Sequence, residues 1–140
     1  MAQTYAAEVS GLYDVPATKP SGAVVGGRLR RFRATITLAS QADGDTVVLA
    51  KVPAGHTFAY GVINASATLG SSKIAVGIAG TAGKYMAAAT FTAAAPTLFG
   101  AVAAEAGAAL TAEEVVILTN TTAALPSSGT LVVDLFFSAP

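Results

Sequence analysis

The side chains that could carry out chemistry in this sequence are few and widely spaced. Among its 140 residues there are one histidine, His56, and no cysteine. A Ser-His-Asp hydrolase of the nucleophile-elbow kind needs a Gly-x-Ser-x-Gly turn, and none occurs. A structural zinc site takes four ligands, mostly cysteine and histidine, which this chain does not supply. We therefore expect no catalytic residue and no metal site, with His56 a turn residue whose ring is solvated or bonded to the backbone.

Two further segments resemble known ligand loops only in part. Asp43-Gly44-Asp45 places two carboxylates close together, but the other oxygen ligands of a calcium loop are missing, so we interpret it as a β-turn. Residues 77–84 are glycine-rich like a phosphate loop. No glycine lies five residues before Gly83, and Tyr85 stands where a magnesium-binding serine or threonine would follow. The sequence therefore predicts no cofactor.

One basic cluster, made of Arg28, Arg30, Arg31 and Arg33, precedes a hydrophobic run. Three interpretations of this cluster are possible. It is a solvated strand edge that deters aggregation, a set of guanidinium groups that pair with carboxylates of an adjacent subunit, or a nucleic-acid site. Phosphate binding needs a clear basic excess, and the formal net charge is +0. We therefore expect no direct nucleic-acid partner. The solvated strand edge and the contact between subunits both remain possible interpretations.

The composition indicates a chain whose surface is covered by other subunits. Charged residues make up 11% and hydrophobic residues 53% of the sequence, whereas an average protein is about 25% charged. Without cysteine, stability must come from packing and oligomerisation. A chain of this length suits one domain with a real core.

Neither terminal nor internal hydrophobicity predicts membrane insertion. Residues 85–104 are uncharged over about the length of a transmembrane helix, but they are rich in alanine and threonine and are interrupted by Pro96 and Gly100. The first residues, MAQTYAAEVSGLYD, have no basic segment followed by an apolar one, so we expect no signal peptide and assembly in a cytoplasm.

From residue 28 onward, short runs with period-two alternation are separated by turn residues. Such runs predict strands, because successive side chains of a strand point to opposite faces. Strands are expected at 28–40, 46–52, 58–69, 73–79, near 85–92, around 97–102, at 115–122 and at 130–138. In the last run Leu131 and Phe137 face the core, so Val132 and Phe136 face outward, where a monomer would prefer polar side chains.

Two segments give conflicting local signals. Residues 80–112 contain alanine repeats with high helix propensity, interrupted by threonine, proline and glycine, and we expect irregular connections around their two short strands. Residues 111–114, Thr-Ala-Glu-Glu, match a capping box that would start a helix. The β-branched run that follows favours a buried strand instead.

Short strands at this spacing predict an all-β fold, a jelly-roll-like β-sandwich of about eight antiparallel strands. Residues 28–140 form the sandwich domain, and residues 1–27 form an extended N-terminal arm that ends at Gly26-Gly27. A frayed tail is the alternative. The apolar residues of the arm favour docking; among them are Tyr5, Leu12 and Tyr13.

Several segments of the chain match one known group of proteins in order and kind. They are Lys19-Pro20-Ser21 with Gly26-Gly27, residues 33–55, Leu69 to Ser72 with the alternating residues 74–80, and the closing residues 125–137. Together they resemble the capsid decoration, or cement, proteins of tailed bacteriophages, which have an arm followed by a jelly-roll-like β-sandwich. The resemblance covers nearly the whole chain and carries over no catalytic residues.

The resemblance implies a non-enzymatic virion protein that binds the outer surface of a phage head and stabilises it, with the major capsid protein as partner and a trimer as the favoured homo-oligomer. The alternative is a head-fibre or tail-associated module that binds a receptor or carbohydrate, although the chain has no tryptophan for sugar stacking. The candidate inter-subunit or capsid contacts are Tyr5, Leu12, Tyr13, Arg28, Arg31, Arg33, Val132 and Phe136.

Overall fold

The period-two runs of the sequence form eight strands within the residues that the structure, a computed structural model, describes. These are residues 2–22 and 24–140, apart from the side chains of residues 7 and 8. The strands are β1 (Arg28–Thr37), β2 (Thr46–Val52), β3 (Thr57–Ala65), β4 (Lys73–Ile78), β5 (Thr81–Thr90), β6 (Thr97–Phe99), β7 (Glu114–Thr121) and β8 (Thr130–Ala139). Short helical turns are α1 (Ala7–Ser10), η1 (Gly11–Tyr13) and α2 (Val102–Glu105).

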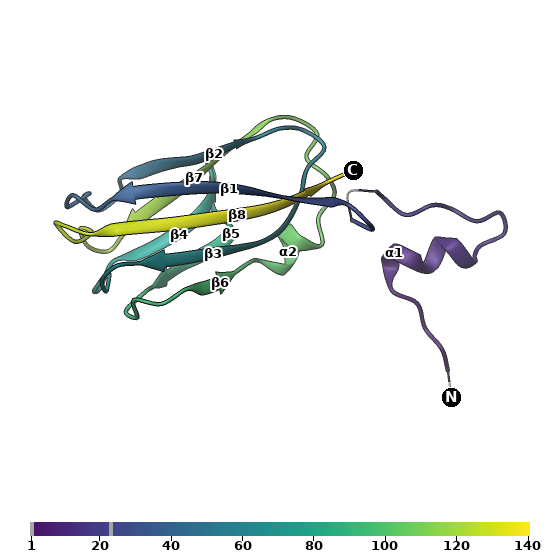
Figure 1. Cartoon of the computed structure of the whole chain (residues 1–140), viewed down its shortest axis with the longest axis horizontal. Helices are drawn as coiled ribbons and strands as arrows, with labels where there is room; N and C mark the ends of the chain where they lie inside the picture. Colours follow the sequence, from purple (N-terminus) through teal and green to yellow (C-terminus); the bar gives the residue numbers. More distant parts are fainter. Residues whose placement is uncertain (1, 23) are drawn as a thin grey trace.

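The strands pair into two antiparallel four-stranded sheets, with the orders β1-β8-β3-β6 and β2-β7-β4-β5 (Figure 1). Only β4 and β5 are neighbours both along the chain and in a sheet. Every other pair joins strands that are distant in sequence, as in a jelly roll of two packed sheets. The predicted all-β, jelly-roll-like sandwich is confirmed.

The inner faces of the two sheets enclose the core. Phe137 of β8 is fully buried, and its ring centroid lies 5.8 Å from Phe32, 5.4 Å from Phe58 and 5.7 Å from Tyr85. These edge-to-face contacts join strands of both sheets at one end of the sandwich. Val133 and other residues of the same alternation in β8 are also buried, as the sequence predicts.

Some element boundaries differ from the sequence-based expectation. β3 ends at Ala65 rather than near residue 69, and β5 begins at Thr81, ahead of the expected residue 85. The glycine-rich segment is therefore the β4–β5 hairpin. A side chain at Gly77 would collide with the carbonyl oxygen of Thr81, 2.2 Å from an added Cβ, so glycine is required by close strand packing rather than by a phosphate.

The two segments with conflicting local signals have different outcomes. β7 starts at Glu114, so the capping-box residues lead into a strand and not a helix. Its ladder with β2 and β4 satisfies the backbone groups that a helix would have satisfied internally. In the connection after β6, which was expected to be irregular, α2 makes a single helical turn. Among the described residues, no helix is long and apolar enough to cross a membrane.

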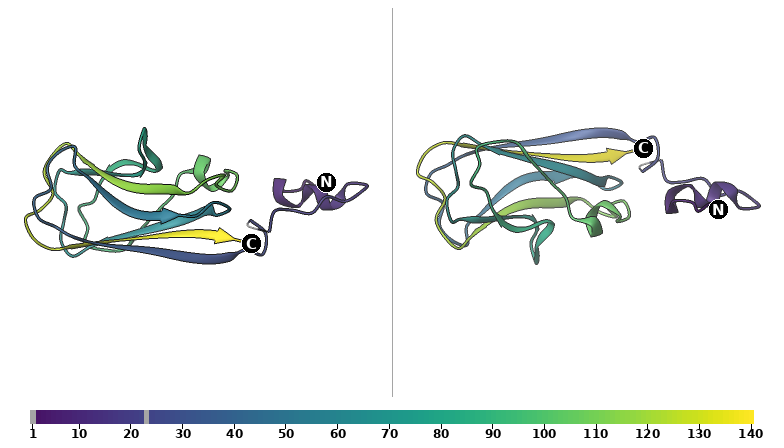
Figure 2. Two further views of the ribbon diagram at one scale, coloured as in Figure 1. Left: turned by 90° about the horizontal axis from the view of Figure 1, so that it is seen from above. Right: turned by 90° about the horizontal axis from the view of Figure 1, so that it is seen from below.

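The N-terminal segment leaves the sandwich beside the end of β8 and extends away along the strand direction (Figure 2). It contains α1 and η1, two short helical turns that the extended pattern did not predict. The accessible surface of the protein is 7775 Å², while folded monomers of 13.8 kDa expose about 6,600 Å². A larger area than that of a compact monomer agrees with a segment that protrudes beyond the sandwich.

Candidate interaction surface

The outer face of the sheet β1-β8-β3-β6 brings together side chains from all four strands. The strand register determines which side chains form a row across the sheet. In one row Arg31 of β1 lies opposite Phe136 of β8, and Phe136 lies opposite Tyr60 of β3. In the next row Arg33 pairs with Asp134 of β8. We call this surface the outer face, formed by Arg31, Arg33 and Thr35 of β1, Val132, Asp134 and Phe136 of β8, Tyr60, Val62 and Asn64 of β3, and Leu98 of β6.

Half of the side chains on the outer face are apolar or aromatic, although the solvent-facing side of a sheet is normally polar. The rings of Tyr60 and Phe136 are stacked, with centroids 4.6 Å apart and planes at 14°. Leu98 is 72% exposed, and Tyr60 is 36% exposed. The predicted outward positions of Val132 and Phe136 agree with this register, since Leu131 and Phe137 are fully buried.

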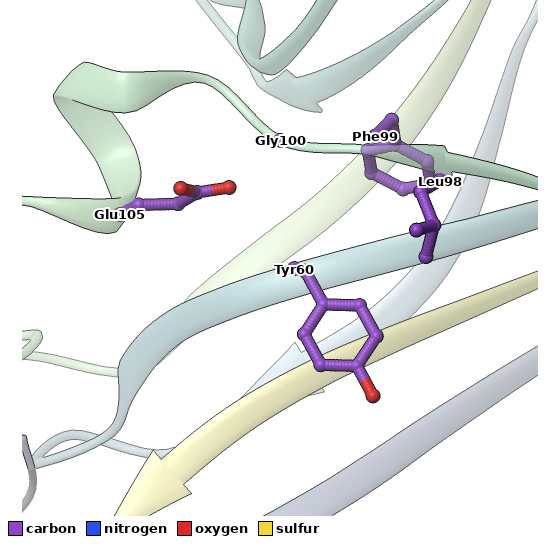
Figure 3. Close-up of a pocket in the computed structure, with 5 residues that line it drawn as sticks. All are labelled: Tyr60, Leu98, Phe99, Gly100 and Glu105. Atoms are coloured by element: carbon purple, nitrogen blue, oxygen red, sulfur yellow. The ribbon is translucent and has the colours of Figure 1, made fainter.

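A shallow groove of about 590 Å³ opens beside the aromatic pair, lined by Tyr60, Leu98, Phe99, Gly100 and Glu105 (Figure 3). On the core side of the same strands, an added Cβ at Gly61 would lie 2.1 Å from the Phe99 ring. The aromatic ring therefore packs directly on the β3 backbone. The Glu105 side chain projects from α2 toward Gly100, so the groove is apolar with one carboxylate at its rim.

The ion pair of Arg33 and Asp134 lies within the outer face. Arg33 Nε donates to Asp134 Oδ1 and Arg33 Nη2 donates to Oδ2, both at 2.8 Å. These hydrogen bonds hold the pKa of the Asp134 carboxyl below its usual range, against the opposing effect of desolvation, and Arg31 adds to the lowering. The guanidinium fork of Arg33 is thus filled within the chain. Arg28 and Arg31 have no ion-pair partner among the side chains that the structure describes.

The candidate residues of the N-terminal segment lie apart from the outer face. The rings of Tyr5 and Tyr13 are stacked with centroids 4.2 Å apart. Leu12 is 46% exposed and Tyr13 63% exposed. The backbone N–H of Thr18 donates to the Gly11 carbonyl at 2.7 Å, which closes this part of the chain into a small loop. The loop therefore exposes its apolar side chains without a core of its own.

Sequence reasoning missed a polar cluster at the end of the core. The Tyr85 hydroxyl donates to Glu114 Oε1, and the ammonium group of Lys84 bonds Oε2. Burial, followed by the bond to Glu114, raises the pKa of Tyr85, so the phenol stays protonated. Both carboxylate oxygens are thus occupied by donors from β5, and the cluster ties that edge strand to β7. Alternation in β7, which places Glu114 on the same face as Val116, was the available signal.

The turn assignments made for possible ligand residues are confirmed. His56 Nδ1 lies 3.1 Å from the carbonyl oxygen of Pro53. Asp43 accepts a bond from the backbone N–H of Thr122 at 3.0 Å, and Asp45 accepts one from Ala42 at 2.8 Å. Within the described part of the chain, no three acidic, histidine or cysteine side chains gather in a way that could hold a metal ion.

The fold is similar to chains of three solved bacteriophage capsids. One, from the capsid of Ralstonia phage GP4, has 20% identity and a TM-score of 0.66, covering 81% of this chain and 86% of that one. A chain of the cyanophage Pam1 capsid asymmetric unit has 17% identity and a TM-score of 0.62, with coverage of 81% and 86%. A chain of the acid-stable capsid of Helicobacter pylori bacteriophage KHP30 has 12% identity and a TM-score of 0.60, with coverage of 80% and 88%.

No relative of the chain is found from sequence similarity. No protein-family model matches, and a search of the curated proteins gives no significant match. At identities of 12–20% the structural likeness establishes a common architecture. The chain therefore shares its eight-stranded sandwich fold with chains found in phage capsids.

Proposed function

We propose that this protein is a non-enzymatic structural component of a phage virion, which binds the outer surface of the head and stabilises the shell. The observation that carries the proposal is the fold, which matches a chain of a phage capsid over 81% of its length. The partner is the major capsid protein, and the subunits form a trimer. Assembly takes place in the host cytoplasm.

The surface of the protein supports a role in assembly. A standard protein interface buries about 800 Å² on each partner, and obligate interfaces are larger and more apolar. The outer face, with Leu98 and the Tyr60–Phe136 pair, and the N-terminal segment, with Leu12 and Tyr13, both expose apolar side chains. Two separate apolar surfaces allow one subunit to contact both its neighbours and the shell.

Cosedimentation with shells of the corresponding phage that lack this protein tests the proposal. We expect the full chain to bind saturably, and electron microscopy to place it outside the shell. A variant without residues 2–25 should keep the far-ultraviolet spectrum and melting temperature of the full chain but fail to cosediment. Absence of binding by the full chain would contradict the proposed function, whereas equal binding by the shortened chain would reject only the anchoring role of the arm.

Light scattering tests the trimer separately. A trimer has three times the 13.8 kDa mass of the chain. A stable monomer at micromolar concentration would contradict self-association, while shell binding could still be measured on that monomer.

A further inference from the structure

The free edge of β1 combines open backbone groups with unpaired positive charge. We propose that an extended acidic segment of a shell protein adds to this edge as an antiparallel strand, with carboxylates that pair with Arg28, Arg30 and Arg31. This assignment rests on the proposed function and deepens it, because it names the chemistry by which the shell holds the protein. β1 lies at the edge of its sheet, with β8 as its neighbour (Figure 1).

The backbone of β1 leaves every second residue open for pairing. The N–H of Leu38 donates to the Gly129 carbonyl, in the same register that pairs β1 with β8. Because N–H and C=O directions alternate along a strand, the even-numbered residues of β1 face β8 and the odd-numbered residues face outward. The outward carbonyl of Thr37 agrees with this, since it accepts a bond from Gln41 Nε2. Within residues 29–35, the outward backbone groups form no hydrogen bond to another described residue.

The other three edges of the two sheets carry features that hinder strand addition, whereas β1 does not. β6 has three residues. The register of β2 with β7 shifts between Val48 and Ala50, and that of β5 with β4 shifts at two places, as in β-bulges. β1 has ten residues and pairs with β8 without a shift. Short or bulged edge strands resist a further strand, so β1 is the edge at which one can add.

The charge of β1 determines which kind of strand can add there. Four of the eight basic residues of the chain lie on this strand, and all four are exposed: Arg28, Arg30, Arg31 and Arg33. Asp134 binds Arg33, whereas the other three have no ion-pair partner among the side chains that the structure describes. Opposite charges stabilise a strand pair and like charges destabilise it. A second copy of β1 would bring arginine beside arginine, so the added strand is acidic.

The alternation of β1 specifies the pattern of acids. Arg31 points to the outer face, and Arg28 and Arg30 point to the other side of the sheet. Directly opposite residues of antiparallel strands share a face, with Cβ atoms about 4.5–5.5 Å apart. Acids opposite these three arginines follow the pattern acid-acid-x-acid along the added strand. The pattern does not occur in this sequence, so a different protein supplies the segment.

Strand addition leaves the apolar part of the outer face free for a neighbouring subunit. Leu98 lies on β6, at the opposite edge of the sheet, and the Tyr60–Phe136 pair lies over β3 and β8. An added strand lies beyond β1 and extends the sheet by one strand. Contact with the shell and contact between subunits therefore use different parts of the sheet.

A synthetic peptide tests the proposal without the phage. In the peptide Thr-Val-Thr-Val-Glu-Glu-Val-Glu, the three glutamates lie opposite Arg31, Arg30 and Arg28 when the first residue lies opposite Thr35. Fluorescence anisotropy of the labelled peptide measures its binding to the full chain at low salt. We expect replacement of the three glutamates by glutamine to weaken binding on the order of tenfold. Equal binding by the two peptides would overturn the proposal.

N-methylation of the peptide tests the pairing of the backbones with a matched control. The fifth residue of the bound peptide directs its N–H toward β1, because it lies opposite an odd-numbered residue, whereas the sixth directs its N–H away. Methylation of the fifth nitrogen should abolish binding, and methylation of the sixth should change it by less than about twofold. Amide hydrogen exchange should show protection of the N–H groups of Leu29, Arg31 and Arg33 in the complex. Equal effects of the two methyl groups, or no protection of these amides, would overturn the added strand.

Charge exchange tests the position of the peptide on β1. Arg31→Glu should weaken binding about tenfold, and a peptide with lysine as its fifth residue should restore it. Lys51→Glu is the matched control, because Lys51 is an exposed basic residue of the edge strand β2, and this variant should bind the original peptide as the wild type does. Failure of the lysine peptide to restore binding would overturn the pairing with Arg31.

Cosedimentation with shells separates this inference from the proposed function. Excess peptide should displace the protein from the shells. If the full chain binds shells but does not bind the peptide, the inference is wrong and the proposed function stands. Peptide binding without displacement would overturn the assignment of the acidic segment to the shell. If the full chain binds the peptide but not the shells, the proposed function is wrong, and with it that assignment.

Discussion

Leu98 and Phe99 are adjacent residues of β6 that face opposite sides of the sheet, and their substitutions should have opposite effects. Leu98 is 72% exposed on the outer face, while Phe99 is 9% exposed and packs on Gly61. Leu98→Asp should change the free energy of unfolding by less than about 0.5 kcal/mol, as for other surface substitutions. Phe99→Ala should lower it by about 3–5 kcal/mol, because it leaves a cavity in the core.

Self-association should respond to Leu98→Asp in the opposite way to stability, because this substitution alters the outer face and not the core. Full burial of a leucine contributes about 1.5–3 kcal/mol, and with Leu98 72% exposed, covering it in a contact supplies about 1–2 kcal/mol of this. Since 1.4 kcal/mol is a factor of ten, Leu98→Asp should weaken self-association at least about 5- to 30-fold. The aspartate must also lose hydration when covered, so the larger value is the better guide.

Urea denaturation followed by circular dichroism measures the unfolding free energy, and sedimentation equilibrium measures association. A large loss of stability in Leu98→Asp would mean that the side chain is not on a solvent-facing surface. Unchanged association of this variant, with the fold intact, would refute the assignment of the outer face as an interface.

Three further predictions concern polar groups that hold the fold. The bonds from Arg33 lower the pKa of Asp134, so the carboxylate stabilises the fold above its ordinary pKa of 3.8, and this stabilisation is lost as the pH falls through the lower folded value. Urea denaturation should therefore show Asp134→Asn to be less stable than the wild type at neutral pH, with the difference shrinking in acid. Tyr85→Phe removes a donor to the partly buried Glu114 carboxylate, so we expect a loss of about 1.5–3 kcal/mol in the same assay. Asn120 is buried, and its Nδ2 lies 2.9–3.1 Å from three backbone carbonyl oxygens. Asn120→Ala should cost about 2 kcal/mol or more, measured as a lower melting temperature, because those acceptors lose their donor.

Matched controls come from exposed residues of the same type. Tyr60→Phe and Asn64→Ala alter the outer face and should change stability by less than about 0.5 kcal/mol. Asp14→Asn, in the N-terminal segment, should leave the acid dependence of stability unchanged. If Tyr85→Phe or Asn120→Ala were as mild as its control, the corresponding polar cluster would not hold the sandwich together. An acid dependence that persists in Asp134→Asn would assign it to another carboxylate.

Local sequence determines which segments are strands and which face of each strand is buried. Residues 46–52 were predicted and form β2 with the same bounds. In β8, alternation places Leu131 and Phe137 inside and Phe136 outside, because side-chain direction in a strand depends only on the parity of position. The same alternation of buried and exposed side chains is present in β7. For this segment the capping box predicted a helix, whereas the β-branched run predicted a strand. The backbone ladder with two neighbouring strands outweighed the helix signal.

Tertiary structure alone decides which side chains are neighbours. Arg33 meets Asp134 across 101 positions of sequence, and Tyr60 stacks on Phe136 because β3 and β1 flank β8 in the sheet. Alternation specifies a face but not the order of strands, which depends on the packing of the whole sandwich. The arginine cluster could therefore be identified from sequence as a candidate contact, but only the strand order showed that Arg33 is paired with Asp134 while Arg31 lies opposite Phe136.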